Sequence, residues 1–374
     1  MAAVRFAKLS TISSVDAQEA SMTCGRRFAF IAILMLAPIA FCQSPDRIQL
    51  QLNASEAEAV LAILDKQTSG QSVTDSDWHA LFATEPYQRL KKREASMHRD
   101  FTDNDFKTFV LSPDLAKRAP ELHRTLDAWK KTDIAAAADR ILPYLPDDAV
   151  IHAKVFPVIK PRTNSFVYDL DTDPTIFLYL DPAVTAAKFE NTVAHEMHHI
   201  GFASIDARTK ALLADVPANA KPAVEWMEAF GEGFAMLAAA GGPDIDPHQV
   251  STPEEHARWV HDMTNYNQDL RTLDQFFLDV IHGKFKSKDE IDEKAFTFFG
   301  AQGPWYTVGY KMAVTIEKQY GRPTLIDCMT DPRKLLVTYN QAARILNEKQ
   351  TSPKSAEPLA LFSPELIRAI APGS

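Results

Sequence analysis

Apolar residues recur at helical spacing along most of the chain, and one short region breaks this pattern. Between residues 46 and 147, the apolar and aromatic positions lie three or four residues apart, as on one face of a helix. Residues 150–160, 165–168 and 175–180 are short segments rich in β-branched and aromatic residues, bounded by Pro, Asn or Asp. The pattern predicts an α+β fold that is predominantly helical and contains one small β-sheet.

Start and stop signals predict the helices of the second half. One helix is expected to begin at Asp181-Pro182 and to end near Gly201, because Asp caps helices and Gly terminates them. Two stretches are rich in charge. We expect residues 91–94 to form an exposed helix face and residues 284–294 to form a loop or exposed turn. Further helices are expected at 222–240, from Thr252 onward, at 270–281, at 306–320 and, within a Ser/Pro-rich tail, from Ser363-Pro364.

Residues 22–42 have the pattern of a secretory signal. Arg26-Arg27 precede an apolar run, and Ala40 and Cys42 provide small residues at the −3 and −1 positions of a cleavage site. The run from Phe28 to Phe41 is too short to span a bilayer comfortably. We expect an exported protein, periplasmic or extracellular, without stable membrane insertion once the signal is removed. Lipid attachment at Cys42 is the second alternative.

Composition narrows the class of partner. The chain has 374 residues and is 46% hydrophobic, so it can bury a sizeable core. Its net charge is −9 and it has no basic run, so no nucleic-acid partner is expected. Of three cysteines, Cys24 and Cys42 lie in the predicted signal, which leaves Cys328 without a disulfide partner in the mature chain.

The candidate chemistry centres on His-Glu-x-x-His at His195, Glu196 and His199. Residues four apart on a helix share one face, so the two imidazoles can bind a single Zn²⁺. Glu196 then lies beside them as a general base for a zinc-activated water. His198 is expected near the metal but not as a ligand, because the other two histidines already occupy the metal face.

A catalytic zinc needs a third protein ligand and an open position. The helix predicted at 222–240 offers Glu225, Glu228 and Glu232, which share a face, and its apolar neighbours indicate burial. We expect Glu232 to be the ligand, with Glu228 as the alternative. The glycines that flank Glu232 would let another helix approach closely.

Hydrolysis also creates an oxyanion, and a phenol is a suitable donor to it. Tyr306 is the candidate, and Tyr310, one turn further along the same predicted helix, is the alternative. A structural tyrosine in the core is the competing interpretation for either residue.

Two resemblances strengthen this interpretation. His-Glu-x-x-His followed by Gly-Glu-Gly-Phe-Ala at 231–235 resembles the gluzincin metallopeptidases, and Tyr306-Thr-Val-Gly309 resembles their aminopeptidase branch. That resemblance implies a zincin-like fold, a zinc cofactor and a tyrosine that stabilises the tetrahedral intermediate. Over most of its length the chain is similar to a poorly characterised bacterial family of predicted zinc-dependent peptidases, through phrases such as Ala-His-Glu-Met-His-His-Ile-Gly and Trp-Tyr-Thr-Val-Gly-Tyr-Lys-Met-Ala.

The departures from the gluzincin pattern limit what carries over. His199 and Glu232 are 33 positions apart, more than in the usual gluzincin, and no exopeptidase motif for a free amino terminus is present. The resemblance therefore implies fold and metal, but not aminopeptidase specificity.

The sequence thus predicts an exported zinc metallopeptidase that acts on a peptide or protein substrate. The small sheet should lie next to the metal helix, with residues 164–168 as an edge strand able to hold an extended peptide. A metal-dependent hydrolase of a non-peptide amide or ester and a non-catalytic zinc-binding scaffold remain as alternatives. The expected parts are an N-terminal extension and signal peptide (1–43), a helical N-terminal region (44–147), a zincin-like catalytic domain (148–350) and a C-terminal tail (351–374).

Overall fold

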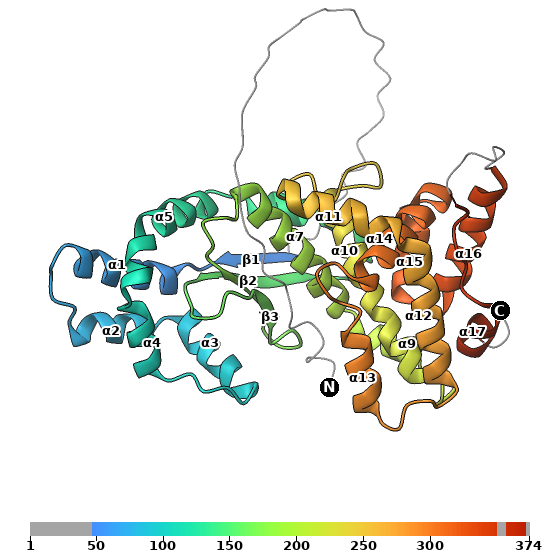
Figure 1. Cartoon of the computed structure of the whole chain (residues 1–374), viewed down its shortest axis with the longest axis horizontal. Helices are drawn as coiled ribbons and strands as arrows, with labels where there is room; N and C mark the ends of the chain where they lie inside the picture. Colours follow the sequence, from blue (N-terminus) through green and yellow to red (C-terminus); the bar gives the residue numbers. More distant parts are fainter. Residues whose placement is uncertain (1–46, 350–356, 372–374) are drawn as a thin grey trace, which may run out of the picture.

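The fold is helical on both sides of a small central sheet. A computed structural model describes residues 47–349 and 357–371, so the predicted signal and Cys42 lie outside the described residues. In Figure 1, helices α1 to α5 lie at the left, the sheet and α7 in the middle, and most helices from α9 onward at the right. This arrangement confirms the α+β, predominantly helical prediction.

The first half of the chain supplies a helical array and most of the sheet. Strand β1 was not predicted, because the rest of the region up to residue 147 has a helical pattern. The elements are β1 (Ile48–Leu52), α1 (Ser55–Thr68), α2 (Asp75–Phe82), α3 (Glu85–Ser96), α4 (Asp103–Val110), α5 (Pro113–Lys130), α6 (Ile134–Ile141), the 3₁₀ turn η2 (Leu142–Tyr144), β2 (Ile151–Val158), β3 (Phe166–Tyr168) and β4 (Thr175–Tyr179).

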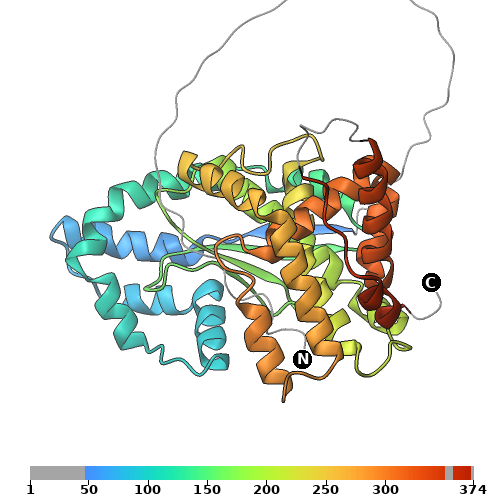
Figure 2. The same ribbon diagram turned by 45° about the vertical axis from the view of Figure 1, so that its right-hand side comes forward.

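The second half is helical throughout. Its last helices stay together on the side opposite α1–α5 when the molecule is turned (Figure 2). The elements are α7 (Ala186–Ala203), α8 (Asp206–Leu212), α9 (Lys221–Met227), the 3₁₀ turn η3 (Glu228–Phe230), α10 (Gly231–Ala240), α11 (Pro253–Thr264), α12 (Tyr266–Ile281), α13 (Lys288–Phe296), α14 (Pro304–Tyr320), α15 (Arg322–Thr330), α16 (Pro332–Lys349) and α17 (Pro364–Ile370).

The sheet has the order β1-β2-β4-β3, in which β3 is an edge strand as predicted. Strands β1, β2 and β4 are parallel, and β3 runs antiparallel to β4 with Phe166 opposite Phe177. Because β1 pairs with β2, the predicted N-terminal region and the predicted catalytic region share one sheet. The division between them stays a prediction.

Side chains alternate between two apolar layers along these strands. Val155 and Ile176 face the main core, which also contains the apolar side of α7, whereas Phe156 and Phe177 face a smaller cluster with Leu90 of α3. This alternation is the period of two expected for strands. Both faces of β2 and β4 are therefore covered, and α7 lies directly after β4 in the chain.

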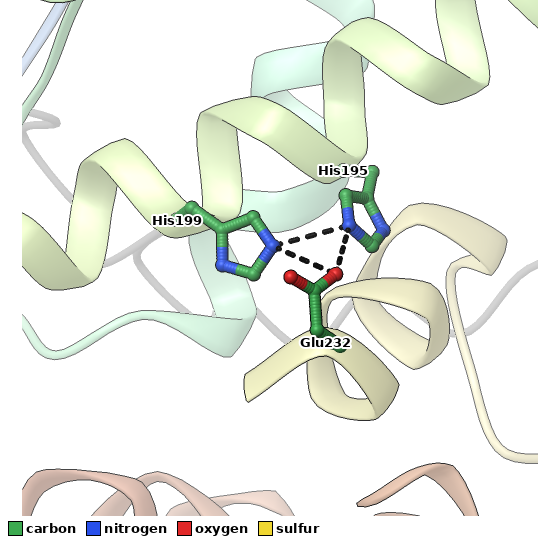
Figure 3. A group of neighbouring side chains, drawn as sticks. All are labelled: His195, His199 and Glu232. Carbon is green, nitrogen blue, oxygen red and sulfur yellow. Dashed lines mark hydrogen bonds and ion pairs between the residues drawn. The ribbon is translucent and has the colours of Figure 1, made fainter. Parts of the chain in front are cut away.

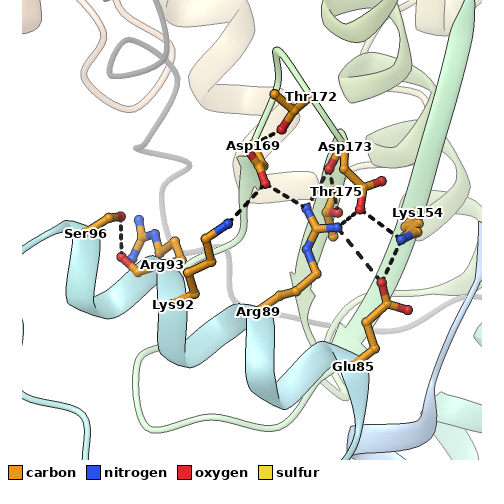
Figure 4. Close-up of polar contacts among 10 residues, drawn as sticks. All are labelled: Glu85, Arg89, Lys92, Arg93, Ser96, Lys154, Asp169, Thr172, Asp173 and Thr175. Atoms are coloured by element: carbon orange, nitrogen blue, oxygen red, sulfur yellow. Dashed lines mark hydrogen bonds and ion pairs between the residues drawn. The ribbon is translucent and has the colours of Figure 1, made fainter.

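A network of ion pairs ties α3 to the turn that joins β3 and β4 (Figure 4). Arg89 binds the carboxylate and carbonyl of Asp173 and approaches Asp169 at 3.5 Å. Lys154 of β2 contacts Glu85 at 2.7 Å and Asp173 at 2.9 Å. The two ends of the turn, Asp169 and Asp173, are thereby held from α3 and β2.

Three local predictions were wrong. The charge run 91–94 is only partly exposed: Arg93 and Glu94 are buried as a pair, with the guanidinium 3.9 Å from the Phe166 ring centroid. Residues 284–294 include most of α13 rather than a loop, because Ser287 caps it and Ile291 packs inward. The chain at 222–240 is helical, but η3 interrupts it.

Helix α7 also begins and ends later than predicted. The Asp181 carboxylate accepts a hydrogen bond from the N–H of Ala183 (3.0 Å), which makes a turn instead of a helix start. Thr185 is the actual cap. Gly201 lies inside the helix, where a Cβ would come 2.4 Å from Leu145, so this glycine serves close packing rather than termination.

Several boundaries match the predictions. Thr252 forms a capping box at α11, Gly241 ends α10 in the left-handed conformation (φ 93°), and Ser363 caps α17. Cys328 is buried with a free thiol among the described residues. No helix within residues 47–349 and 357–371 combines the length and the apolar character needed to cross a membrane.

Candidate metal centre

Helix α7 is held firmly from two sides. The Thr185 hydroxyl accepts a hydrogen bond from the N–H of Lys188 (3.2 Å) in its first turn. Trp129 of α5 stacks on Phe189 with ring centroids 4.4 Å apart, and Lys188 forms a largely buried ion pair with Glu255 of α11. These contacts fix the rotation of α7, and with it the direction in which its histidines point.

Helix α10 reaches the site because it packs backbone to backbone against α14. A Cβ on Gly233 would lie 1.9 Å from the backbone nitrogen of Tyr310, and a Cβ on Gly309 would lie 2.4 Å from the carbonyl oxygen of Phe230. No residue but glycine fits at either position without moving a helix. The close approach expected from the glycines around Glu232 is therefore present, and α14 is the helix that makes it.

His195, His199 and Glu232 converge on one point (Figure 3). The Nε2 atom of His195 lies 3.1 Å from Glu232 Oε2 and 3.1 Å from His199 Nε2, and His199 Nε2 lies 3.5 Å from the same carboxylate oxygen. Donor atoms about 2.0–2.1 Å from one tetrahedral zinc are separated by about 3.3 Å. The triangle of donors therefore fits a single Zn²⁺.

The centre is withdrawn from water. The side chains of His195, His199 and Glu232 are 12%, 8% and 7% exposed. Burial alone would raise the pKa of Glu232, but the two histidines outweigh it and hold that pKa below its usual value. Buried lone pairs that face one another are stabilised by a cation among them.

Glu196 is buried on α7, the helix that carries His195 and His199. Burial raises the pKa of its carboxyl group to about 7; Glu232 adds to this rise and His195 opposes it. Glu196 is 4% exposed. A carboxyl group with a pKa near neutrality can both accept and return a proton.

The two candidate tyrosines differ in what they contact. Burial, then the carboxylates of Glu232 and Glu196, raise the pKa of Tyr306 well above its usual value, so the phenol remains a proton donor beside the cluster. Tyr310 directs its hydroxyl to the carbonyl oxygen of Ile245 (3.4 Å). Of the two, Tyr306 is thus the one in contact with the donor cluster.

The three acids predicted to share a face point to three different places. The turn η3 has a tighter winding than an α-helix and changes the phase between Glu225 and Glu232. Glu225 lies 3.9 Å from Lys288 of α13, at the surface. Glu228 is half-buried and lines a pocket beside His199.

That pocket is the feature the sequence did not indicate. It has a volume of about 100 Å³ and is lined by four separate segments of the chain: the β3–β4 turn, the end of α7 with α8, η3 with the start of α10, and α15. His198, predicted to lie near the metal, lines it as well. Burial lowers the pKa of His198 well below its usual value, so its ring is neutral.

Comparison with known proteins gives one match. The model of the family described as "Putative zinc dependent peptidase (DUF5700)" matches residues 78–348, which include every element of the cluster. A search of curated proteins found no match, and neither did a search of solved structures. The zinc dependence of this family agrees with the donor set that the structure brings together.

Metal binding provides the first test. The purified protein should bind about one zinc per chain, and His195→Ala or His199→Ala should abolish binding. Glu232→Gln should weaken zinc binding more than Glu228→Gln or Glu225→Gln, because loss of a group that only supports a ligand typically costs about 10–100-fold. Isothermal titration of metal-free protein with zinc measures all five variants. A site emptied by Glu228→Gln and left full by Glu232→Gln would reverse the two assignments.

Helix packing provides the second test. Gly233→Ala should destabilise the fold by about 1–3 kcal/mol or more and weaken zinc binding, because α10 must move away from α14. Gly231→Ala is the matched control, since its Cβ would lie at ordinary contact distances from Met329 (3.7 Å) and His199 (4.0 Å). Thermal unfolding with and without zinc distinguishes the variants, and equal behaviour would contradict this account of the packing.

Proposed function

The chain belongs to the family described as "Putative zinc dependent peptidase (DUF5700)". From that premise we propose that it is a zinc metallopeptidase whose ligands are His195, His199 and Glu232. The observation that carries the proposal is the triangle of buried donor atoms with sides of 3.1, 3.1 and 3.5 Å. Zinc, when bound, supplies Lewis-acid chemistry that polarises a peptide carbonyl and makes water acidic near neutral pH.

Glu196 is proposed to move the protons. Its carboxylate takes a proton from the attacking water as the new C–O bond forms, and it passes that proton to the amine when the C–N bond breaks. The support is its position next to His195 on the same helix and its nearly complete burial. A scaffold that only stored zinc would need the ligands but no carboxyl group held this way.

Tyr306 is proposed to stabilise the oxyanion. Its phenol keeps its proton beside Glu232 and Glu196, and a preorganised donor in a dry site is effective where negative charge develops. Tyr310, whose hydroxyl faces Ile245, lacks this placement.

The peptide is proposed to lie along β3. This strand is at the edge of the sheet, where an extended chain can add by main-chain hydrogen bonds. The turn that follows β3 carries Leu170 and Asp171 to the pocket beside His199, so the edge and the cluster are joined by one short segment. We also propose that the protein acts outside the cytoplasm, on the basis of the signal pattern at residues 22–42.

Replacement of the base tests the proposed chemistry. Glu196→Gln should leave zinc bound and lower kcat for peptide hydrolysis by about 10²–10⁴-fold or more. The assay is the release of new amino termini from a mixed peptide substrate by zinc-loaded protein, with zinc content measured on the same samples. Unchanged kcat would remove this mechanism. Hydrolysis of esters without hydrolysis of peptides would favour the non-peptide alternative.

A pair of tyrosine variants tests the oxyanion donor. Tyr306→Phe should lower kcat by about 10²-fold with KM nearly unchanged, since the donor acts on charge that develops in the transition state. Tyr310→Phe, the control, should keep its kcat. If Tyr306 were only a core residue, its loss would weaken the fold by about 1 kcal/mol while turnover per folded molecule stayed the same. Steady-state kinetics and melting temperature separate these outcomes.

A further inference from the structure

We propose that the pocket beside His199 binds a lysine or arginine side chain of the substrate residue next to the cleaved bond. This inference rests on the proposed peptidase function. The pocket touches His199 itself, so a side chain that fills it belongs to a residue close to the metal centre. With a volume of about 100 Å³, it has room for a side chain rather than for a drug-sized ligand.

The walls of the pocket suit the alkyl stem of a long side chain. Leu170 and Phe202 contribute apolar surface from the β3–β4 turn and from α7, and Ala203 and Met329 extend it. Gly231 forms part of the wall without a side chain, which keeps the space open next to His199. Lys and Arg are the residues that bury an apolar stem while their head group stays charged.

The charged groups of the pocket all accept hydrogen bonds. Asp171, Asp206 and Glu228 line it with carboxylates, and no Lys or Arg is among its lining residues. Thr209 is the remaining hydroxyl. Several carboxylates around one space favour a cationic head group over a neutral or acidic one.

His198 provides independent evidence for a polar ligand. The residue is 2% exposed and lines the pocket, and its Nδ1 atom has no hydrogen-bond partner. A buried polar atom without a partner is unfavourable, and a polar group of a bound ligand would satisfy it.

The chain itself shows that an ammonium group is stable beside these acids. Lys210 of α8 binds the Asp206 carboxylate, and its pKa is raised first by that contact and further by Asp171 and Glu228. The side chain of Lys210 is 60% exposed, so a substrate cation can share or replace its position. The overall charge of −9 also attracts cationic peptides.

The wall from the β3–β4 turn is rigidly placed. Arg89 and Lys154 hold Asp173 at one end of the turn, and Arg89 also approaches Asp169 at the other (Figure 4). Leu170 and Asp171 lie between these two anchored residues. A preorganised wall supports selectivity because less order must be imposed when the ligand binds.

A binding experiment tests the pocket without relying on turnover. Zinc-loaded Glu196→Gln protein is titrated with alanine-based hexapeptides in which one lysine is placed at each position in turn, with norleucine peptides as uncharged matches. At one position, the peptide with lysine should bind about tenfold tighter than the peptide with norleucine. This preference should become smaller as the salt concentration is raised. Equal affinity at every position, or no binding of any peptide, would overturn the proposal.

Variants locate the effect in the pocket. Glu228→Gln should remove most of the lysine preference while zinc stays bound, and Gly231→Leu should weaken both the lysine and the norleucine peptide by filling the space. Glu225→Gln is the matched control, since it removes an acid from the adjacent turn of α9 that does not line the pocket. An equal loss in Glu225→Gln would mean general charge attraction and would overturn the assignment.

Cleavage by the wild-type protein separates this inference from the proposed function. Cleavage of the peptides with no preference for a basic residue would remove the pocket assignment and leave the peptidase intact. Binding with lysine preference but no cleavage of any peptide would remove the peptidase proposal and leave the cation pocket standing.

Discussion

Three electron-pair donors meet at one buried point, and the arrangement of the surrounding helices follows from this constraint. Two imidazole nitrogens and a carboxylate oxygen lie within 3.5 Å of one another at positions with little access to water. Without a cation, such a set brings lone pairs together where solvent cannot separate them. A divalent metal satisfies all three donors, so metal binding should stabilise this part of the fold in addition to serving the proposed chemistry.

The constraint is met by unusually close packing around α10, which lies between α7 and α14. Gly233 and Gly309 remove side chains where α10 and α14 touch, and Gly201 does the same where α7 meets Leu145. Backbones in direct contact have little freedom to slide or rotate. The donors on α7 and α10 are therefore positioned before any ligand arrives, as an efficient site requires.

The centre has two unlike sides. On one side, the groups proposed for proton transfer and oxyanion binding are buried on α7 and α14, where packing fixes them. On the other side, the pocket beside His199 is built from a turn, from helix ends and from partly or fully exposed acids. Residues of the second kind can change without disturbing the core, because they sit where chain segments are exposed. Most of the residues proposed for recognition thus differ from those proposed for proton transfer and oxyanion binding, although His199 borders both the donor cluster and the pocket.

The sequence alone determined what depends on neighbours along the chain. The spacing of His195 and His199 fixes their common face on α7, because a helix repeats every 3.6 residues, and caps and strand periodicity gave the helical α+β class. Interpretation failed at Gly201 because a distant residue decides the outcome: this glycine packs against Leu145 instead of ending the helix. At residues 284–294 the cap at Ser287 is a local helix signal, and the prediction followed the high charge of the segment instead. The flanking glycines pointed to Glu232, but its place in the donor cluster required the contact between α10 and α7. The pocket was decided by tertiary structure alone, since its walls come from four segments that have no common pattern and meet only when the chain is folded.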